Sequence, residues 1–110
     1  INWNNDAINI ERHIRAFNPQ PITHSFLKGL RIKIWEGKAE KYQGGAAPGT
    51  VLQLERDGIH IACMRSKIII TKVQLPMGRG TVLTAKDIVN SRRELFQPGN
   101  YFAEHSNGLA

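Results

Sequence analysis

Residues 50–75 read TVLQLERDGIHIACMRSKIIITKVQL, and this stretch determines the fold. Strand-forming residues run from 50 to 55, and Asp57-Gly58 is the strongest short hairpin signal in the chain. The chain then returns through alternating apolar residues from Ile59 to Cys63. Residues 67–75 carry isoleucine and valine on both faces, as does a strand that is buried from two sides. The stretch therefore predicts an antiparallel sheet.

The segment before this stretch begins with a helical pattern. Over residues 7–17 apolar side chains recur at spacings of three and four, and charged side chains take the opposite face. The apolar residues are Ala7, Ile10, Ile14 and Phe17, and the charged ones are Glu11, Arg12 and Arg15. Asn5 or Asp6 can cap the helix, and Pro19 is expected to stop it. Residues 18–21, which contain two prolines, are then a stiff connector.

The period changes to two after residue 21. Apolar and polar residues alternate over residues 30–35, and Lys28-Gly29 just before them is a fair hairpin turn. Residues 43–49, with three glycines and a proline, are expected to form a loop.

The segment after residue 75 predicts a loop at residues 76–80 and then a short helix. Thr84 can cap this helix, with Asp87 at the third helical position. Three apolar residues of the helix are expected to face inward: Ala85, Ile88 and Val89. Pro98-Gly99 is expected to end the helix, and residues 100–102 to add a last short strand.

Five or six short strands, with one helix before them and one near the end, predict a small closed or nearly closed barrel. With 110 residues the chain has the usual size of one domain. We expect residues 1–102 to form that single domain and residues 103–110 to be a flexible tail.

The charge of the chain is unevenly placed. Its net charge of +6 comes entirely from residues 65–93, where seven cations face only Asp87. The cations are Arg65, Lys67, Lys72, Arg79, Lys86, Arg92 and Arg93. Such a density of positive charge is typical of a surface that binds a polyanion, and RNA or DNA is the first candidate. The alternative is a solvated face that only aids solubility.

Two positions near these cations have competing interpretations. Cations near a helix C-terminus also suit the macrodipole, so one of Arg92 and Arg93 can be structural. Two adjacent arginines point in different directions, which argues against that role for both. Trp35, near Arg31 and Lys33 on the same strand, can stack a base, but packing on a neighbouring strand is the commoner outcome.

Catalytic and metal-binding patterns are missing from the sequence. The four histidines match no zinc spacing, and the glycines of residues 44–49 lack the Gly-Lys-Ser/Thr ending of a phosphate-binding loop. The single cysteine, Cys63, indicates a reducing compartment, so we expect a cytoplasmic protein. The longest apolar run, residues 61–64, is too short for a membrane span.

Several blocks of sequence carry a resemblance that runs in order over nearly the whole chain. They are INW at residues 1–3, IRAFNPQP at 14–21, APGTV at 47–51, DGI at 57–59, VQLPMGR at 73–79, DIVNSRRE at 87–94 and FQPGN at 96–100. In these blocks the chain resembles the C-terminal domain of bacterial methionyl-tRNA formyltransferases. The resemblance implies a mainly β fold, an OB-like open barrel with an N-terminal amphipathic helix and a short helix near the C-terminus.

The resemblance also implies a function. The basic face of such a domain helps to hold initiator methionyl-tRNA, while a separate N-terminal catalytic domain transfers formyl from 10-formyltetrahydrofolate to the methionine amine. The catalytic Asn, His and Asp of the family belong to that other domain, whose His-Pro-Ser-Leu-Leu-Pro stretch is absent here. Family members commonly have glycines where this chain has Met64-Arg65-Ser66, so this turn is expected to be shaped differently.

We therefore expect a monomeric domain with no catalytic, cofactor-binding or metal-binding residue, inactive by itself, whose partners are initiator methionyl-tRNA and the N-terminal catalytic domain. The candidate nucleic-acid-binding residues are Arg93, Arg92, Lys86, Arg79, Lys72 and Lys67. Two alternatives stay open. One is the equivalent domain of a sugar-nucleotide formyltransferase, which needs no basic patch, and the other is a basic module that binds an acidic protein.

Overall fold

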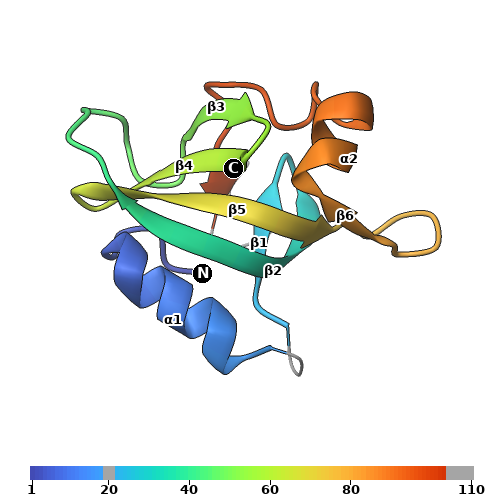
Figure 1. The fold of residues 1–110 in the computed structure, drawn as a ribbon, viewed down its shortest axis with the longest axis horizontal. Helices are drawn as coiled ribbons and strands as arrows, with labels where there is room; N and C mark the ends of the chain where they lie inside the picture. Colours follow the sequence, from blue (N-terminus) through green and yellow to red (C-terminus); the bar gives the residue numbers. More distant parts are fainter. Residues whose placement is uncertain (19–21, 104–110) are drawn as a thin grey trace.

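A computed structural model describes residues 1–18 and 22–103 of the chain. Within these residues helices flank a single antiparallel sheet (Figure 1). The elements, in chain order, are α1 (Ala7–Ala16), β1 (His24–Leu27), β2 (Leu30–Lys41), β3 (Val51–Glu55), β4 (Gly58–Cys63), β5 (Ser66–Gln74), β6 (Val82–Thr84), α2 (Ala85–Ser91) and β7 (Phe102–Ala103).

The sheet curls until its two edges meet. The strand order is β3-β4-β5-β2-β1-β7, and β6 pairs with β5 outside this path. Just before β3 and β7, Thr50 and Tyr101 form an antiparallel bridge, and the amide of Val51 donates to the carbonyl O of Asn100 at 2.7 Å. The prediction of a mainly β, OB-like open barrel is therefore confirmed.

Strand β5 lies at the centre of the barrel, as its sequence predicts. It pairs with β4, with β2 and, near its end, with β6. Three consecutive residues, Ile68, Ile69 and Ile70, are buried, so both faces of this part of the strand are covered.

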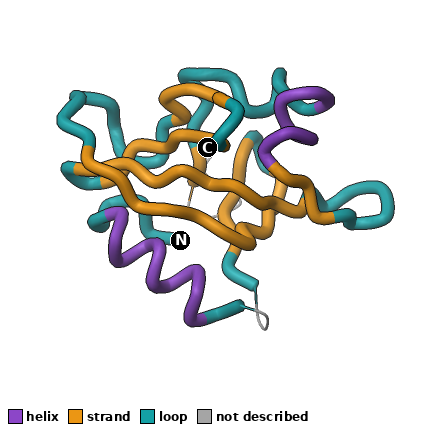
Figure 2. The backbone as a smooth tube through the Cα atoms, in the orientation of Figure 1, coloured by secondary structure: helices purple, strands orange, loops and turns teal. Residues whose placement is uncertain are grey.

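Helix α1 packs against β2 and β5 (Figure 2). The buried face is the one that its periodicity predicts. Ala7, Ile10 and Ile14 are buried. The prediction for Phe17 is wrong: the helix ends at Ala16, and Phe17 is its C-cap with 40% of its surface exposed. Asp6 is the N-cap by position, without a side-chain capping bond. Of the expected connector at residues 18–21, residues 19–21 lie outside the described residues.

The helical pattern places Glu11 with Arg12 and Arg15 on the face that points away from the sheet. In the structure Glu11 contacts the sheet instead. One oxygen of its carboxylate accepts a 2.6 Å hydrogen bond from the amide of Ala39 in β2, and the other pairs with Arg15 at 3.1 Å. The helix periodicity could not show this contact, because the amide comes from a strand 28 residues away.

The turns of the sheet lie at or within one residue of the positions that the sequence predicts. Lys28-Gly29 forms the turn between β1 and β2, and both residues have positive φ. Between β3 and β4 the turn residues are Arg56 and Asp57, and Gly58 already pairs with Glu55 in the ladder. The signal at Asp57-Gly58 therefore gave the hairpin correctly but placed its turn one residue late.

The turn between β4 and β5 is formed without a glycine. Met64 and Arg65 connect the paired residues Cys63 and Ser66. Arg65 takes a left-handed conformation, with φ of 56°, which a glycine would adopt at no steric cost.

Residues 82–91 form one element more than predicted. The capping box at Thr84 and Asp87 is confirmed, but the three residues before the helix form β6, which the sequence did not reveal. Helix α2 ends at Ser91 rather than at Pro98-Gly99, because the chain leaves helical geometry at Arg92 and places Phe96 in the core.

The last described residues close the barrel. The bridge at Tyr101 and the strand β7 correspond to the short strand expected at residues 100–102, shifted towards the C-terminus. Ala103 pairs with Phe26. Residues 104–110, the rest of the expected tail, lie outside the described residues.

Candidate nucleic-acid interface

The two candidate cations of β5 are paired with carboxylates of β2. Lys67 lies opposite Glu40 in the ladder, with 3.4 Å between Nζ and Oε1, and Lys72 lies opposite Glu36, at 3.8 Å. The side chain of Lys67 is only 16% exposed. Counting charges along residues 65–93 cannot detect this pairing, since the carboxylates belong to the neighbouring strand.

The other four candidate cations form no ion pair with any residue in the described ranges. Arg79 lies in the loop between β5 and β6, Lys86 lies in the first turn of α2, and Arg92 and Arg93 follow that helix. The structure therefore does not gather the six candidates at one point. It places the four unpaired candidates around three hollows, and each hollow receives at least one further cation from a segment outside residues 65–93.

The first hollow lies at the end of α2 and has a volume of about 560 Å³. Its lining residues are Lys28 and residues 90–95, which include Arg92, Arg93 and Glu94. Lys28 comes from the turn between β1 and β2. Arg92 is the C-cap of α2, and its guanidinium donates to the carbonyl O of Ser91 at 3.0 Å, so this arginine has the structural role that one of the pair was expected to have.

The second hollow, of about 400 Å³, lies between β2 and the loop of residues 76–80. Arg31 and Lys33 line it from the strand and Arg79 lines it from the loop, and the other lining residues carry no charge. The loop projects from the body of the domain (Figure 1). This hollow therefore brings together three cations without a carboxylate in its lining.

Arg31 and Lys33 were not predicted as interface residues. They belong to the part of the sequence where acids and bases cancel, and only the sheet register brings Lys33 opposite Gln74, two residues before the loop. The alternation of residues 30–35 was the available signal, because it places both cations on the polar face of the strand. Arg56, which lines the third hollow beside Lys86, was missed for the same reason.

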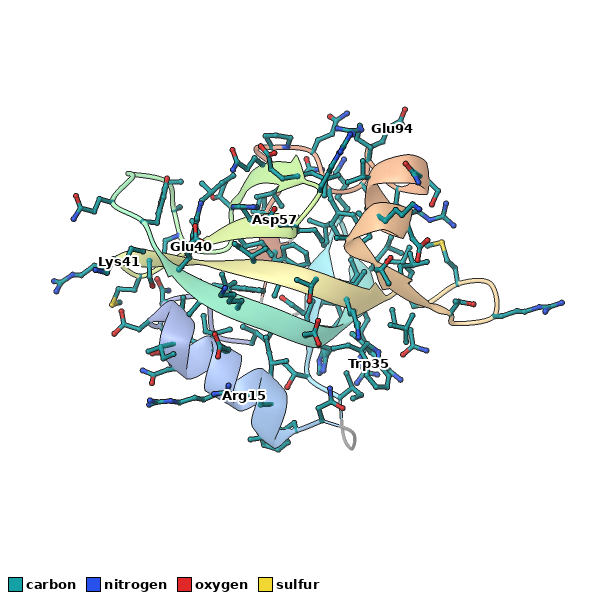
Figure 3. All side chains as sticks on the ribbon, viewed as in Figure 1. Arg15, Trp35, Glu40, Lys41, Asp57 and Glu94 are labelled. Atoms are coloured by element: carbon teal, nitrogen blue, oxygen red, sulfur yellow. The ribbon has the colours of Figure 1, made fainter. Side chains whose placement is uncertain are left out.

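Trp35 is held by a neighbouring strand, which was the commoner of the two outcomes considered. Its indole Nε1 donates to Oε1 of Gln74 at 3.0 Å, and the ring is half-buried. Figure 3 shows it well apart from Glu40 and Lys41, which lie at the C-terminal end of the same strand.

The titratable groups give no indication of a catalytic centre in the described part of the chain. Burial raises the pKa of the Cys63 thiol to about 12, which makes this cysteine a poor nucleophile. Burial, followed by the charge of Arg31, lowers the pKa of His24. No group of His, Cys, Asp and Glu side chains able to hold a metal ion occurs among the residues that the structure describes. Nor does either described helix have the length and apolarity to cross a membrane.

Comparison with known proteins identifies the family. Residues 1–93 match the family model described as "Formyl transferase, C-terminal domain". The chain belongs to this family. The match covers the barrel from the N-terminal segment to Arg93, so the resemblance seen in the sequence motifs is confirmed.

The relatives of the chain are methionyl-tRNA formyltransferases. The one from Pseudomonas fluorescens (strain Pf0-1) is 43% identical over 99 residues, which are 90% of this chain and 30% of that protein. The one from Pseudomonas putida (strain W619) is 39% identical over 104 residues, 94% of this chain and 32% of the relative. The chain thus spans about a third of the length of these relatives and corresponds to their C-terminal domain.

Proposed function

We propose that this domain holds initiator methionyl-tRNA for a methionyl-tRNA formyltransferase. In this proposal the N-terminal catalytic domain transfers formyl from 10-formyltetrahydrofolate to the methionine amine, and the present domain contributes no catalytic group. The observation that carries the proposal is the grouping of cations from separate elements around three hollows, two of which have no carboxylate in their lining.

The physical basis of the binding is electrostatic. Lysine and arginine side chains replace counterions along the phosphate backbone, and this gives affinity and orientation with little reading of sequence. Arg79, Lys86, Arg92 and Arg93 suit this role because their charges are not neutralised by a described carboxylate. Lys67 and Lys72 belong to the proposed surface as well, with a smaller contribution, since each would have to exchange a carboxylate for a phosphate.

The relatives support the choice of substrate, since they are named methionyl-tRNA formyltransferases. Selection of the initiator tRNA and the chemistry would both lie in the two thirds of the relatives that this chain does not span. The domain would act in the cytoplasm, as a monomer, beside the catalytic domain.

Two other functions make different predictions. The equivalent domain of a sugar-nucleotide formyltransferase would bind a small nucleotide and have no need of clustered cations, and a basic interaction module would bind an acidic protein. Titrating the chain separately with tRNA, a nucleotide sugar and an acidic protein of similar charge distinguishes the three. We expect binding to tRNA with a strong dependence on salt, and preferential binding of either other ligand would contradict the proposed function.

A further inference from the structure

Of the three hollows, the one between β2 and the loop of residues 76–80 combines three cations with a lining that contains no carboxylate, whereas the hollow beside Lys86 has two cations. Glu94 lines the hollow at the end of α2, and Lys67 and Lys72 are paired with glutamates. Here three positive charges from two segments lie around an open space of about 400 Å³. Like charges brought together without counter-charges repel one another, so an anion between them stabilises the arrangement.

Gln74 fixes the two sides of this hollow relative to one another. It lies directly opposite Lys33 in the ladder between β2 and β5. Its side-chain amide nitrogen donates to the carbonyl O of Gly80, at the far end of the loop that carries Arg79. Its side-chain oxygen accepts the indole N–H of Trp35. One glutamine therefore connects the strand, the loop and the tryptophan.

A bulge in β2 makes the contact with Trp35 available. Ile34 pairs with Val73 and Glu36 with Lys72, so that Trp35 has no partner of its own on β5. A bulge of this kind bends the strand and re-aims a side chain, and bulges are frequent beside functional sites. Here the indole is directed to Gln74, the residue that holds the loop.

The surroundings of Arg31 show the same excess of positive charge. The guanidinium lies 3.5 Å from Nδ1 of His24, which is itself the ladder partner of Lys33. Burial and then the charge of Arg31 lower the pKa of His24, and a histidine supplies no negative charge in either protonation state.

We propose that Arg31, Lys33 and Arg79 form a binding site for a phosphodiester of RNA, and that Gln74 is the positioning residue of the site. The inference rests on the proposed function and deepens it, because it assigns one point of contact and adds two residues of β2 to the interface. Cations on two sides suit a tetrahedral anion with exposed oxygens. Pro76 and Met77 in the same lining are exposed and offer apolar surface to the adjoining ribose or base.

The first experiment measures the affinity of the 110-residue chain for tRNA over a range of salt concentrations. Lys33→Ala and Arg79→Ala should each reduce the slope of log K against log salt by about one unit, which is about a tenfold loss of affinity at 0.1 M salt. Lys33→Arg should retain the slope, because it keeps the charge. The matched control is Lys38→Ala, an exposed cation of the same strand that does not line the hollow and should leave the slope unchanged.

Gln74→Ala tests the positioning role. If Gln74 acts by holding the loop that carries Arg79, Gln74→Ala should reduce the salt slope as Arg79→Ala does. The double variant Gln74→Ala/Arg79→Ala should then lose no more affinity than either single variant. Unchanged binding by Gln74→Ala, or losses that add fully in the double variant, would overturn this role.

The indole N–H resonances of the two tryptophans give a second, local readout by NMR. Trp3 is buried and bonded to Ser25, away from the hollow, whereas Trp35 is bonded to Gln74. Addition of tRNA should shift the Trp35 resonance and leave that of Trp3 in place, and Arg79→Ala should reduce the shift. A Trp3 resonance that stays at its wild-type position in each variant shows that the fold is intact.

The outcomes separate this inference from the proposed function. If tRNA binds with a steep salt dependence but Lys33→Ala and Arg79→Ala bind as the wild type does, the site is wrong and the proposed function stands. If tRNA does not bind at all, both are wrong. If inorganic phosphate shifts Trp35 and tRNA does not, the hollow takes small anions and its assignment to RNA is overturned.

Discussion

The indole Nε1 of Trp3 donates a 2.9 Å hydrogen bond to Oγ of Ser25, and this hydroxyl donates in turn to the carbonyl O of Ala103, also at 2.9 Å. Trp3 belongs to the segment before α1, Ser25 to β1 and Ala103 to β7. The serine thus joins three segments that are far apart in the sequence, and it does so in the interior, since its exposure is 0%.

Ser25→Ala removes a single oxygen atom, but it should clearly destabilise the domain. It leaves the buried indole N–H without an acceptor, and we expect the free energy of unfolding to fall by about 1–3 kcal/mol. Urea denaturation measures the change. Ser91→Ala is the matched control, because the hydroxyl of Ser91 makes an exposed bond to the carbonyl O of Asp87. Equal effects of the two substitutions would contradict the assigned role of Ser25.

Gly58 should not tolerate a side chain. Its φ of 140° is rarely adopted by other residues, and a Cβ would collide with the backbone carbonyl O of Ile70 in the central strand. We expect Gly58→Ala to destabilise the domain by at least about 1 kcal/mol, measured as a lower melting temperature. The matched control is Gly45→Ala, where a Cβ meets no atom within 4 Å and φ lies outside the left-handed region. A melting temperature that falls as far for Gly45→Ala as for Gly58→Ala would count against this explanation.

The fold could be predicted from the sequence where local and tertiary preferences agree. Three features are indicated by a few neighbouring residues each, and the structure confirms all three. They are the isoleucines of β5, the turn at Lys28-Gly29 and the cap at Thr84. Strand β6 could not be predicted, since three residues carry no readable period and the strand exists through its pairing with β5. Helix α2 ends early for a similar reason, because burial of Phe96 depends on the assembled core.

The candidate site was less predictable than the fold. The charge count identified cations with no described carboxylate partner, such as Arg79, but it also selected Lys67, which a glutamate of β2 neutralises. It omitted Arg31 and Lys33, because acids elsewhere in the sequence cancel them in number without lying beside them. Charge along a sequence indicates a binding surface only after the sheet register has been taken into account.

The stability of the domain should decrease as the pH falls from 7.5 to 5. Burial is the main cause that lowers the pKa of both His13 and His24 from 6.5. Well above pH 6.5 both rings are neutral in the folded and the unfolded chain, so the pKa shifts have no effect there. Below it the unfolded chain binds protons first, and stability is lost until the pH falls below the lowered pKa values.

Comparison with a variant isolates these two rings from the other titrating groups. The difference in melting temperature between the wild type and His13→Gln/His24→Gln should change between pH 7.5 and 5, with the wild type losing more. The change should be small, because neither ring is deeply buried. Parallel curves for the two proteins would show that these histidines do not contribute to the pH dependence.

Arg93 tests whether the cations beside α2 take part in binding tRNA. The chain should bind tRNA weakly, with little sequence preference, and roughly three or four simultaneous phosphate contacts would give a slope of log K against log salt near −2 to −4. Arg93→Ala should weaken the binding of all tRNAs about equally and reduce the slope by about one unit, because one fewer counterion is released. Arg12→Ala, on an exposed position of α1 where acids and bases balance, is the control and should change little.

If Arg93→Ala leaves both the affinity and the slope intact while Arg79→Ala lowers them, contact with tRNA is confined to the side of the domain that carries the loop of residues 76–80. If neither variant has an effect, the basic segment is only a solvated face, and the proposed role in holding tRNA is wrong.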